Sequence, residues 1–225
     1  MTAASYAPTP LRIDFVSDVV CPWCAVGLVS LQQAVERVRE EIDVEIHVQP
    51  FELDDSTPRE GVDVATNLKR KYGMSDAQLA ENQERIRQRG AELGFTFDFN
   101  ARSRGWNTFD AHRLLHWAAV EGTGLQLALK QALLVANFTD GRDIGDHAVL
   151  AEIASNVGLD AAGAAEVLAS GRYADEVRQL EGFFRQLGIR SVPAVIIERK
   201  HLVSGGQPPE VFEQALRQIA AQQAG

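Results

Sequence analysis

The sequence predicts an α/β fold in which a helical block interrupts a small sheet domain. Three observations indicate this. Residues 9–60 have a strand–helix–strand pattern, and residues 188–225 have a strand–strand–helix pattern. Between them, residues 61–187 show mostly helical periodicity over a stretch far too long for a loop. The βαβ and ββα halves are therefore expected to form one domain, with the all-helical segment as an insertion between them.

The first half is expected to contain strands over residues 11–17 and 43–51, separated by a helix over residues 27–41. Apolar and polar residues alternate in both strands, as in a sheet with one buried face. The alternating apolar residues are Leu11, Ile13 and Phe15 in the first strand, and Val44, Ile46 and Val48 in the second. The helix between them has apolar residues at helical spacing, namely Leu28, Leu31, Val35 and Val38.

The inserted segment is expected to be a series of packed helices joined by glycine-containing turns. The expected helices cover residues 62–72, 75–94, 108–122, 125–138, 146–157, 161–169 and 173–187, with a short extended piece over 95–99. Ser75 precedes an acidic residue and is expected to cap the second of these helices. The closing half is expected to have strands over 192–197 and 201–204, followed by a helix that begins at Pro208 and Pro209.

The bulk composition is that of an ordinary globular protein. The 225 residues are 45% hydrophobic and 24% charged, which is enough to bury a core. The net charge of −9 disfavours nucleic acid and anionic membranes as partners. No apolar run approaches the ~20 residues of a membrane span, and the first ten residues do not form a signal peptide. We therefore expect a cytoplasmic protein, and the sequence leaves monomer and homodimer open.

The chain contains two cysteines, Cys21 and Cys24, and both lie where the first strand gives way to the first helix. A helix start carries a partial positive charge of roughly half a unit, which stabilises a thiolate. Cysteines of such motifs have pKa values of roughly 3.5 to 7.5, against about 8.5 for a free cysteine. Pro22 fits a first helical turn because its missing N–H has no partner there. The pattern predicts Cys21 as the exposed nucleophile and Cys24 as the resolving thiol of a thioredoxin-like redox site.

Two other interpretations of the cysteine pair stay open. A structural zinc site needs four ligands, and His112 and His116, four residues apart on one helix face, are candidates for the other two. The cysteines can also be inert core residues, because cysteine is often buried. A structural disulfide is unexpected in the cytoplasm, so a cysteine pair there more often performs chemistry. The redox interpretation is therefore favoured, and no metal site is expected.

Other side chains near the cysteine pair are weaker candidates for roles in the site. Asp14 and Asp18 precede the cysteines, and a buried carboxylate near the resolving thiol is a candidate proton carrier. Trp23 is expected to contact substrate, because aromatic residues are enriched at recognition sites. Histidine is a common acid or base near neutral pH, but nothing in the sequence places His112 beside the sulfurs. It is therefore interpreted as a residue that packs inside the insertion.

Five motifs spread over nearly the whole chain carry a family resemblance. They are Asp18-x-x-Cys21-Pro22-Trp23-Cys24-x-x-Gly27, Asn107-Thr108-x-x-Ala111-His112-Arg113-Leu114, Asp143-Ile144-x-Asp146-x-x-Val149-Leu150, Val192-Pro193 and Ser204-Gly205-Gly206-Gln207-Pro208. In these motifs the chain resembles the DsbA-like thioredoxin superfamily, and within it the cytosolic FrnE-type disulfide oxidoreductases. The resemblance implies a thioredoxin fold with a large all-helical insertion.

The resemblance also implies roles for individual residues of the site. The catalytic residues would be Cys21, Cys24 and Pro193, with a cis peptide bond between Val192 and Pro193 that faces the dithiol. Pro22, Trp23 and Val192 would contact the substrate. No bound cofactor is implied beyond a redox-active Cys21–Cys24 disulfide, and glutathione is a candidate reductant. Disulfide-containing proteins or small-molecule thiols would be the substrates.

The expected activity is thiol–disulfide exchange, in which Cys21 attacks a substrate disulfide and Cys24 resolves the mixed disulfide. The expected potential, roughly −150 to −240 mV, makes the protein a reductase and isomerase of protein disulfides in a glutathione pool. One alternative is a glutathione-dependent isomerase or transferase of the 2-hydroxychromene-2-carboxylate isomerase type, a group that typically has serine at the first cysteine position. The other is a non-catalytic holdase or assembly module that binds through the apolar groove around Trp23.

Overall fold

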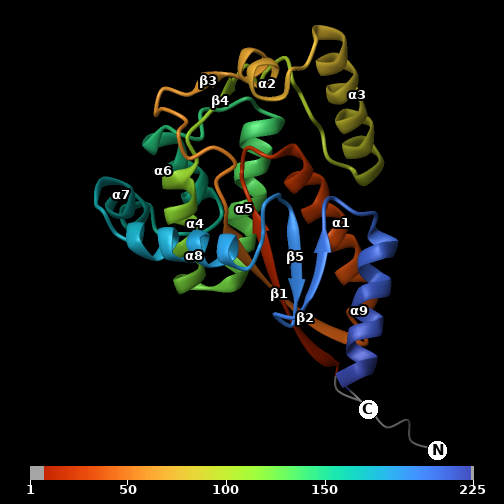
Figure 1. The fold of residues 1–225 in the computed structure, drawn as a ribbon. Coiled ribbons are helices and arrows are strands. Elements are labelled where there is room, and N and C mark those ends of the chain that lie inside the picture. The colour runs from red at the N-terminus through yellow and green to blue at the C-terminus, as the bar shows by residue number, and fades with distance from the viewer. Residues whose placement is uncertain (1–7, 224–225) are drawn as a thin grey trace, which may run out of the picture.

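The computed structural model describes residues 8–223, and both ends of the chain contribute strands to one sheet (Figure 1). Its strands are β1 (Thr9–Ser17), β2 (Ile42–Pro50), β5 (Ala194–Ile197) and β6 (His201–Ser204), in the order β2–β1–β5–β6. β1 is parallel to β2, and β5 is antiparallel to both β1 and β6. The βαβ and ββα halves therefore close into a single sheet, as predicted, and the α/β fold class is confirmed.

Two helices, α1 (Pro22–Val38) and α9 (Pro209–Gln223), lie side by side and cover one face of this sheet (Figure 1). The alternation of β1 explains this packing, because Ile13 and Phe15 point into the same fully buried core as the apolar residues of both helices. On the opposite face, Val16 packs in a smaller cluster that includes Phe184. The sheet is thus buried on both faces near its centre, where β1 lies.

The inserted segment is almost entirely helical, as predicted. Its elements are β3 (Val62–Asp63), α2 (Val64–Tyr72), α3 (Asp76–Leu93), β4 (Arg104–Gly105), α4 (Phe109–Glu121), α5 (Thr123–Phe138), α6 (His147–Asn156), α7 (Ala161–Ala169) and α8 (Ala174–Gln186). Ser75 caps α3, accepting a hydrogen bond from the backbone N–H of Gln78, whose side chain bonds the Ser75 N–H in return. The predicted ends of these helices agree with the structure to within a few residues.

Three local features refine the sequence predictions. The helix whose apolar repeat was expected over residues 27–41 begins at Pro22, so the cysteine motif itself forms its first turn, as the fit of Pro22 to a first turn indicated. Residues 95–99 pair with no strand in the described part of the chain, since the Phe97 ring turns inward and lies 5.3 Å from the ring centre of Phe138. The short β3–β4 pairing was not predicted, because two residues a side show no periodicity.

The insertion does not have a core separate from that of the sheet. Ile86 and Leu93 of α3, together with Leu134 and Phe138 of α5, belong to the same buried cluster as the sheet residue Phe15. A second cluster, within the insertion, also takes in residues 19 and 48 of the sheet half. The predicted division into residues 9–60, 61–187 and 188–225 therefore describes the order of the chain, whereas the packing crosses both boundaries. No helix within residues 8–223 has the length and apolar character needed to cross a bilayer.

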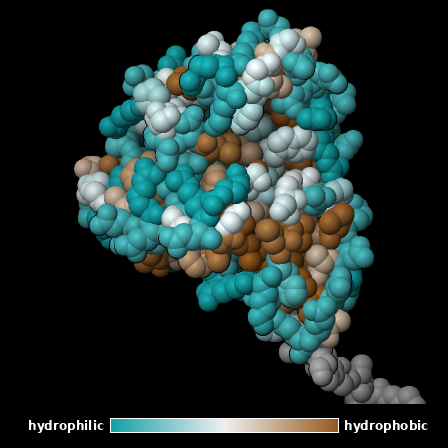
Figure 2. Space-filling model, viewed as in Figure 1, coloured by the Kyte–Doolittle hydropathy of each residue, from teal (hydrophilic) through white to brown (hydrophobic). Residues whose placement is uncertain are grey.

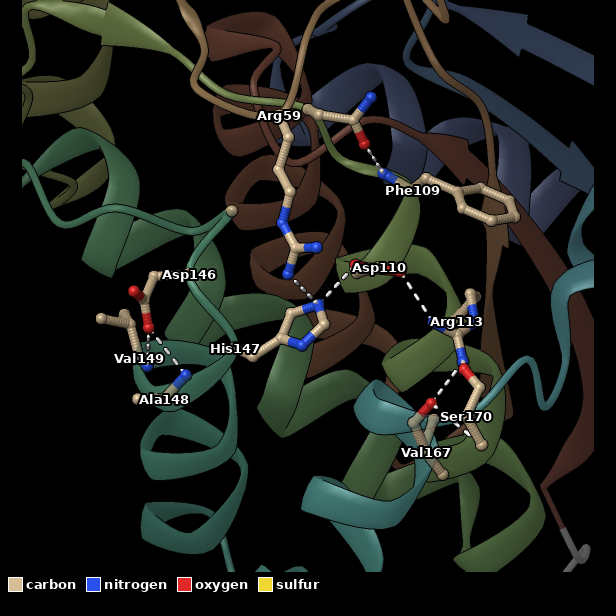
Figure 3. A network of polar contacts seen from close by, with 12 residues as sticks. Arg59, Phe109, Asp110, Arg113, Asp146, His147, Ala148, Val149, Val167 and Ser170 are labelled. Carbon is tan, nitrogen blue, oxygen red and sulfur yellow. Dashed lines mark hydrogen bonds and ion pairs between the residues drawn. The ribbon is translucent and has the colours of Figure 1, made fainter.

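A polar network ties the loop after β2 to the insertion (Figure 3). The His147 ring lies between two partners, with its Nε2 atom 2.6 Å from Asp110 Oδ2 and 3.0 Å from the Arg59 guanidinium. Asp110 also accepts a hydrogen bond of 2.7 Å from Arg113, which donates to the carbonyl groups of Val167 and Ser170. The network connects α4, α6 and α7 to the loop that leads away from the sheet.

A candidate dithiol active site

The cysteine motif sits at the junction between β1 and α1. Cys21 occupies the position just before the helix, with φ −89° and ψ 113°, and Pro22 is the first helical residue. The backbone N–H of Cys24 donates a 3.0 Å hydrogen bond to the Cys21 carbonyl and closes the first turn. Both thiols are free. Cys21 is 5% exposed and Cys24 is fully buried, so the predicted order of exposure is confirmed, although Cys21 is itself buried and not exposed as predicted.

The environment separates the pKa values of the two thiols. Hydrogen bonding from the Cys24 thiol is the largest influence on Cys21, and with backbone N–H groups of the first turn it outweighs burial and lowers the Cys21 pKa. Burial raises the pKa of Cys24 well above the ordinary value, and its hydrogen bond to Cys21 adds to this effect. The site therefore contains one thiol poised to ionise and one that keeps its proton.

The segment before β5 lies against the start of α1. The Cys21 Sγ atom is 3.6 Å from the carbonyl oxygen of Val192, and the Val192–Pro193 peptide bond is cis, as the resemblance implied. A Cβ atom added at Gly27 would lie only 2.8 Å from Pro193 Cγ. Glycine at this position therefore lets α1 approach the loop closely enough to place Val192 beside the dithiol.

The two predicted carboxylates have different surroundings. The Asp14 side chain accepts hydrogen bonds of 2.7 Å from Arg12 and from Gln49 on the sheet, and neither sulfur is among its contacts. Asp18 is 1% exposed and accepts a 2.8 Å hydrogen bond from the backbone N–H of Leu53. Its charge also acts on Cys21. Of the two candidate proton carriers, Asp18 is thus the one that lies near the dithiol.

His112 and Lys130, from the insertion, complete a buried group of charges that sequence reasoning missed. His112 is 1% exposed, and its Nε2 atom lies 3.5 Å from Asp18 Oδ1. Burial alone would raise the pKa of Asp18, but His112, the Leu53 N–H and Lys130 together lower it. His112 is thus buried inside the insertion, as interpreted, but it also contacts Asp18, which the sequence did not indicate. A usable signal for Lys130 was that it is the one charged residue of α5.

Arg102 is a further cation beside the site that was not predicted from the sequence. Its guanidinium donates hydrogen bonds of 3.3 Å to the Val20 carbonyl and 3.2 Å to the Asn137 side chain. Burial lowers the pKa of Arg102 to about 10, although the negative charges of Cys21 and Asp18 act in the opposite direction. Arg102 stays protonated at neutral pH and adds positive charge next to the Cys21 thiolate.

Cys21 lines a cavity of about 760 Å³ between α1 and the α2–α3 hairpin, a size typical of small-molecule sites. Pro22, Trp23 and Val192, the predicted substrate contacts, line it as well. Its more distant wall is mostly apolar and includes Val64, Leu68, Tyr72, Met74, Leu79, Ile86, Phe99 and Trp106. Figure 2 shows hydrophobic surface gathered in the hollow beneath α2.

The residues of the zinc alternative do not converge. His112 faces Asp18, whereas the His116 ring lies against Tyr173, with 5.1 Å between the ring centres. Within residues 8–223, no group of three or more His, Cys, Asp and Glu side chains is placed to hold a metal ion. The geometry therefore offers a dithiol and its neighbouring charges, with a cavity on one side.

Comparison with known proteins finds a matching family model and several structures of similar fold. The family model of the DSBA-like thioredoxin domain matches residues 12–217. A probable DsbA oxidoreductase from Streptomyces coelicolor is 39% identical, with a TM-score of 0.85 over 92% of this chain and 89% of its own. Two more distant structures share the fold. A 2-hydroxychromene-2-carboxylate isomerase is 13% identical, with a TM-score of 0.72 over 95% of this chain and 98% of its own. The cytosolic disulfide reductase DsbM from Pseudomonas aeruginosa is 20% identical, with a TM-score of 0.63 over 92% of this chain and 98% of its own.

Proposed function

The chain belongs to the DsbA-like thioredoxin domain family, and from that premise we propose that it is a thiol–disulfide oxidoreductase with Cys21 as its nucleophile. The observation that carries the proposal is the position of Cys21, whose sulfur meets a large cavity and whose pKa is lowered by the buried Cys24 thiol. A low pKa provides thiolate at neutral pH, and the thiolate is the species that attacks disulfides.

The reaction proceeds in two exchanges. The Cys21 thiolate attacks one sulfur of the substrate disulfide, whose S–S bond breaks, and the other substrate sulfur leaves as a thiolate. Cys24 then loses its proton and attacks Cys21 Sγ, so that the substrate is released as a second thiolate and the enzyme disulfide forms. Asp18, close to the dithiol, carries the Cys24 proton. Two molecules of a thiol such as glutathione return the enzyme to its dithiol state.

We further propose that the protein works as a reductase and isomerase of disulfides in the cytoplasm. Lowering the Cys21 pKa stabilises the reduced form, which favours the dithiol in a glutathione pool. The likeness to DsbM, a cytosolic disulfide reductase studied with GSH, supports this location and direction. The apolar cavity is suited to substrates that carry an apolar group beside the disulfide, in a protein or a small molecule.

Two activity assays test this proposal, with Cys21→Ser and Cys24→Ser as the decisive variants. The reduced protein should reduce insulin and refold scrambled ribonuclease, Cys21→Ser should lose both activities, and Cys24→Ser should accumulate mixed disulfides. A Cys21→Ser/Cys24→Ser double variant that loses both activities but still suppresses the aggregation of an unfolded protein would instead support a holdase. Glutathione-dependent isomerisation of 2-hydroxychromene-2-carboxylate, without disulfide exchange, would support the isomerase alternative.

A further inference from the structure

Helix α5 presents three buried polar side chains to the region behind the dithiol. Gln126, Lys130 and Asn137 are spaced four and seven residues apart, so they share one face of the helix. Gln126 exchanges two hydrogen bonds of 2.9 Å with the backbone of Val48, and Asn137 donates one of 3.1 Å to the Val19 carbonyl. These bonds fix α5 against β2 at one end and against the segment before Cys21 at the other, and Lys130 lies between them on the helix.

Lys130 has a different environment from its two neighbours on this face. Its side chain is fully buried, and its Nζ atom has no hydrogen-bond partner among the described residues. A buried, unpaired cation is costly unless negative charge lies nearby. Burial lowers the pKa of Lys130, and the negative charges of Cys24, Asp18 and Cys21 act in the opposite direction. Its position is therefore explained by the charges of the active site and not by a structural hydrogen bond.

We propose that Lys130 is a positioning residue for the resolving step. Its positive charge stabilises one negative charge in the buried site, first on Asp18 and then, after proton transfer, on Cys24. The inference rests on the proposed function and deepens it. Lys130 comes from the insertion, whereas the dithiol comes from the sheet half. The insertion thus contributes to the chemistry as well as to the cavity.

The resolving step comprises two proton transfers and one exchange of disulfide bonds. In the mixed disulfide, the proton of Cys24 Sγ passes to the Asp18 carboxylate, and the negative charge passes to sulfur. The Cys24 thiolate then bonds to Cys21 Sγ, and the bond between Cys21 and the substrate sulfur breaks. Asp18 also lines the cavity, so its proton passes to the substrate thiolate that leaves there. Lys130 remains protonated and offsets one negative charge until the substrate departs.

The burial of the site explains why a cation is needed. A second buried negative charge beside Asp18 would be strongly disfavoured, and a buried carboxylate without a cation takes up a proton. A protonated Asp18 has no capacity for the Cys24 proton. The charge of Lys130 lowers the pKa of Asp18, in addition to the larger effects of His112, 3.5 Å from Asp18, and of the Leu53 N–H. It also lowers the pKa of Cys24, against the larger effect of burial. Without Lys130, the resolving step should therefore require a higher pH.

The test follows the reaction of the reduced protein with 5,5′-dithiobis(2-nitrobenzoate) by stopped flow. Attack by Cys21 releases one thionitrobenzoate, and resolution by Cys24 releases the second, so one absorbance trace separates both steps. In Lys130→Met, which keeps the length of the side chain, the second phase should slow roughly tenfold at pH 7. Its pH midpoint should rise by about one unit, while the first phase changes much less.

Matched variants separate a charge effect from a packing effect. Gln126→Met removes buried hydrogen bonds from the same face of α5 and should leave the ratio of the two phases unchanged. Asp18→Asn should also slow the second phase, and the double variant with Lys130→Met should be no slower than the slower single variant, because the two residues act as a unit. Lys130→Gln serves as a second variant if Lys130→Met does not fold.

The outcomes for the two proposals are distinguishable. A wild-type protein that releases no second thionitrobenzoate would contradict the proposed function itself. A wild-type protein with two phases, together with a Lys130 variant that keeps the same second phase and pH midpoint, would overturn the role of Lys130. Additive effects of Lys130→Met and Asp18→Asn would also overturn it, since they would indicate independent packing defects.

Discussion

At the scale of single residues, the influence of Cys24 distinguishes two chemically identical thiols. Hydrogen bonding from the Cys24 thiol is the largest cause that lowers the Cys21 pKa, while the Cys21 Sγ atom lies 3.6 Å from the Val192 carbonyl. The same bond, after burial, raises the pKa of Cys24. A proton shared in this way favours ionisation of the sulfur that faces the cavity. The asymmetry follows from the first turn of α1, which buries Cys24 beneath Cys21.

Replacing Cys24 tests this account with two substitutions of similar size. Serine keeps a donor at position 24, whereas alanine removes it. We therefore expect the Cys21 pKa to be higher in Cys24→Ala than in Cys24→Ser, and below about 8.5 in the serine variant. The rate of Cys21 alkylation by iodoacetamide as a function of pH measures both values. Equal midpoints in the two variants would show that the helix start, and not the Cys24 thiol, controls Cys21.

The cysteines were predictable from the sequence, and the charges around them were not. Two cysteines three apart at a strand–helix junction form a local pattern, and their exposure follows from the first helical turn. Lys130, Arg102 and His112 are more than 75 residues away along the chain, and they reach the site only through the packing of the insertion. Such contacts leave no periodic signal, although His112 does lie in one of the motifs that carried the resemblance.

At the scale of elements, helix α8 is attached beside β2 through a buried pair of carboxylates. Glu52, just after β2, and Glu181 of α8 are 1% and 2% exposed at their side chains, and Arg178 bridges them. Burial and the charge of Glu181 raise the pKa of Glu52, while Arg178 lowers it. The Arg178 guanidinium also lies over the Phe109 ring, 3.8 Å from the ring centre. The guanidinium therefore offsets two charges that the sheet half and the insertion bury together.

Arg178→Met should destabilise the protein in a pH-dependent way. We expect a loss of about 2 kcal/mol near pH 8, less than for a fully buried pair because the Arg178 side chain is 45% exposed. Without the cation, the Glu52 pKa in the folded state rises further above its unfolded value. The folded protein then binds a proton that the unfolded chain lacks, so the deficit should shrink as the pH falls towards 5.

Urea unfolding of Arg178→Met at pH 5 and pH 8 measures this difference. Arg185→Met is the matched control on the same helix, because Arg185 forms an exposed contact of 3.4 Å with Asp55. Its effect should stay within about 0.5 kcal/mol and show no such pH dependence. A deficit for Arg178→Met that is equal at both pH values would mean that lost packing, and not the buried carboxylates, causes the destabilisation.

The elements themselves were largely predictable from the sequence, for a physical reason. Strand alternation in β1 and helical spacing in α3, α5 and α7 arise from burial of one face, which leaves a repeating pattern. The β3–β4 pairing and the path of residues 95–99 depend on contacts between distant segments. The first turn of α1 contains the cysteines and no apolar repeat, so its start could be inferred from Pro22 but not from periodicity.

At the scale of the whole molecule, the insertion and the sheet half share their packing. One buried cluster joins β1, α1 and α9 to α3 and α5, and a second joins the insertion to residues near the ends of β1 and β2. The buried charges at Asp18 and Lys130 also come from the two sides of the predicted boundary. The sequence indicated an insertion by its position in the chain but gave no indication of this shared core.

A shared core predicts that the two parts unfold together. The three tryptophans allow this to be tested, because Trp23 lies on α1 and Trp117 on α4. Trp106→Phe/Trp117→Phe reports through Trp23, and Trp23→Phe/Trp106→Phe reports through Trp117. In each variant, we expect the urea transition measured by fluorescence to coincide with the transition that circular dichroism measures for the same variant. The proteins are kept reduced, so that the dithiol stays in one state. The Trp117 fluorescence could instead change at a urea concentration where the helical signal and the Trp23 fluorescence stay native. The insertion would then be an independent folding unit. In that case the contacts of α3 and α5 with the sheet core would contribute little to stability.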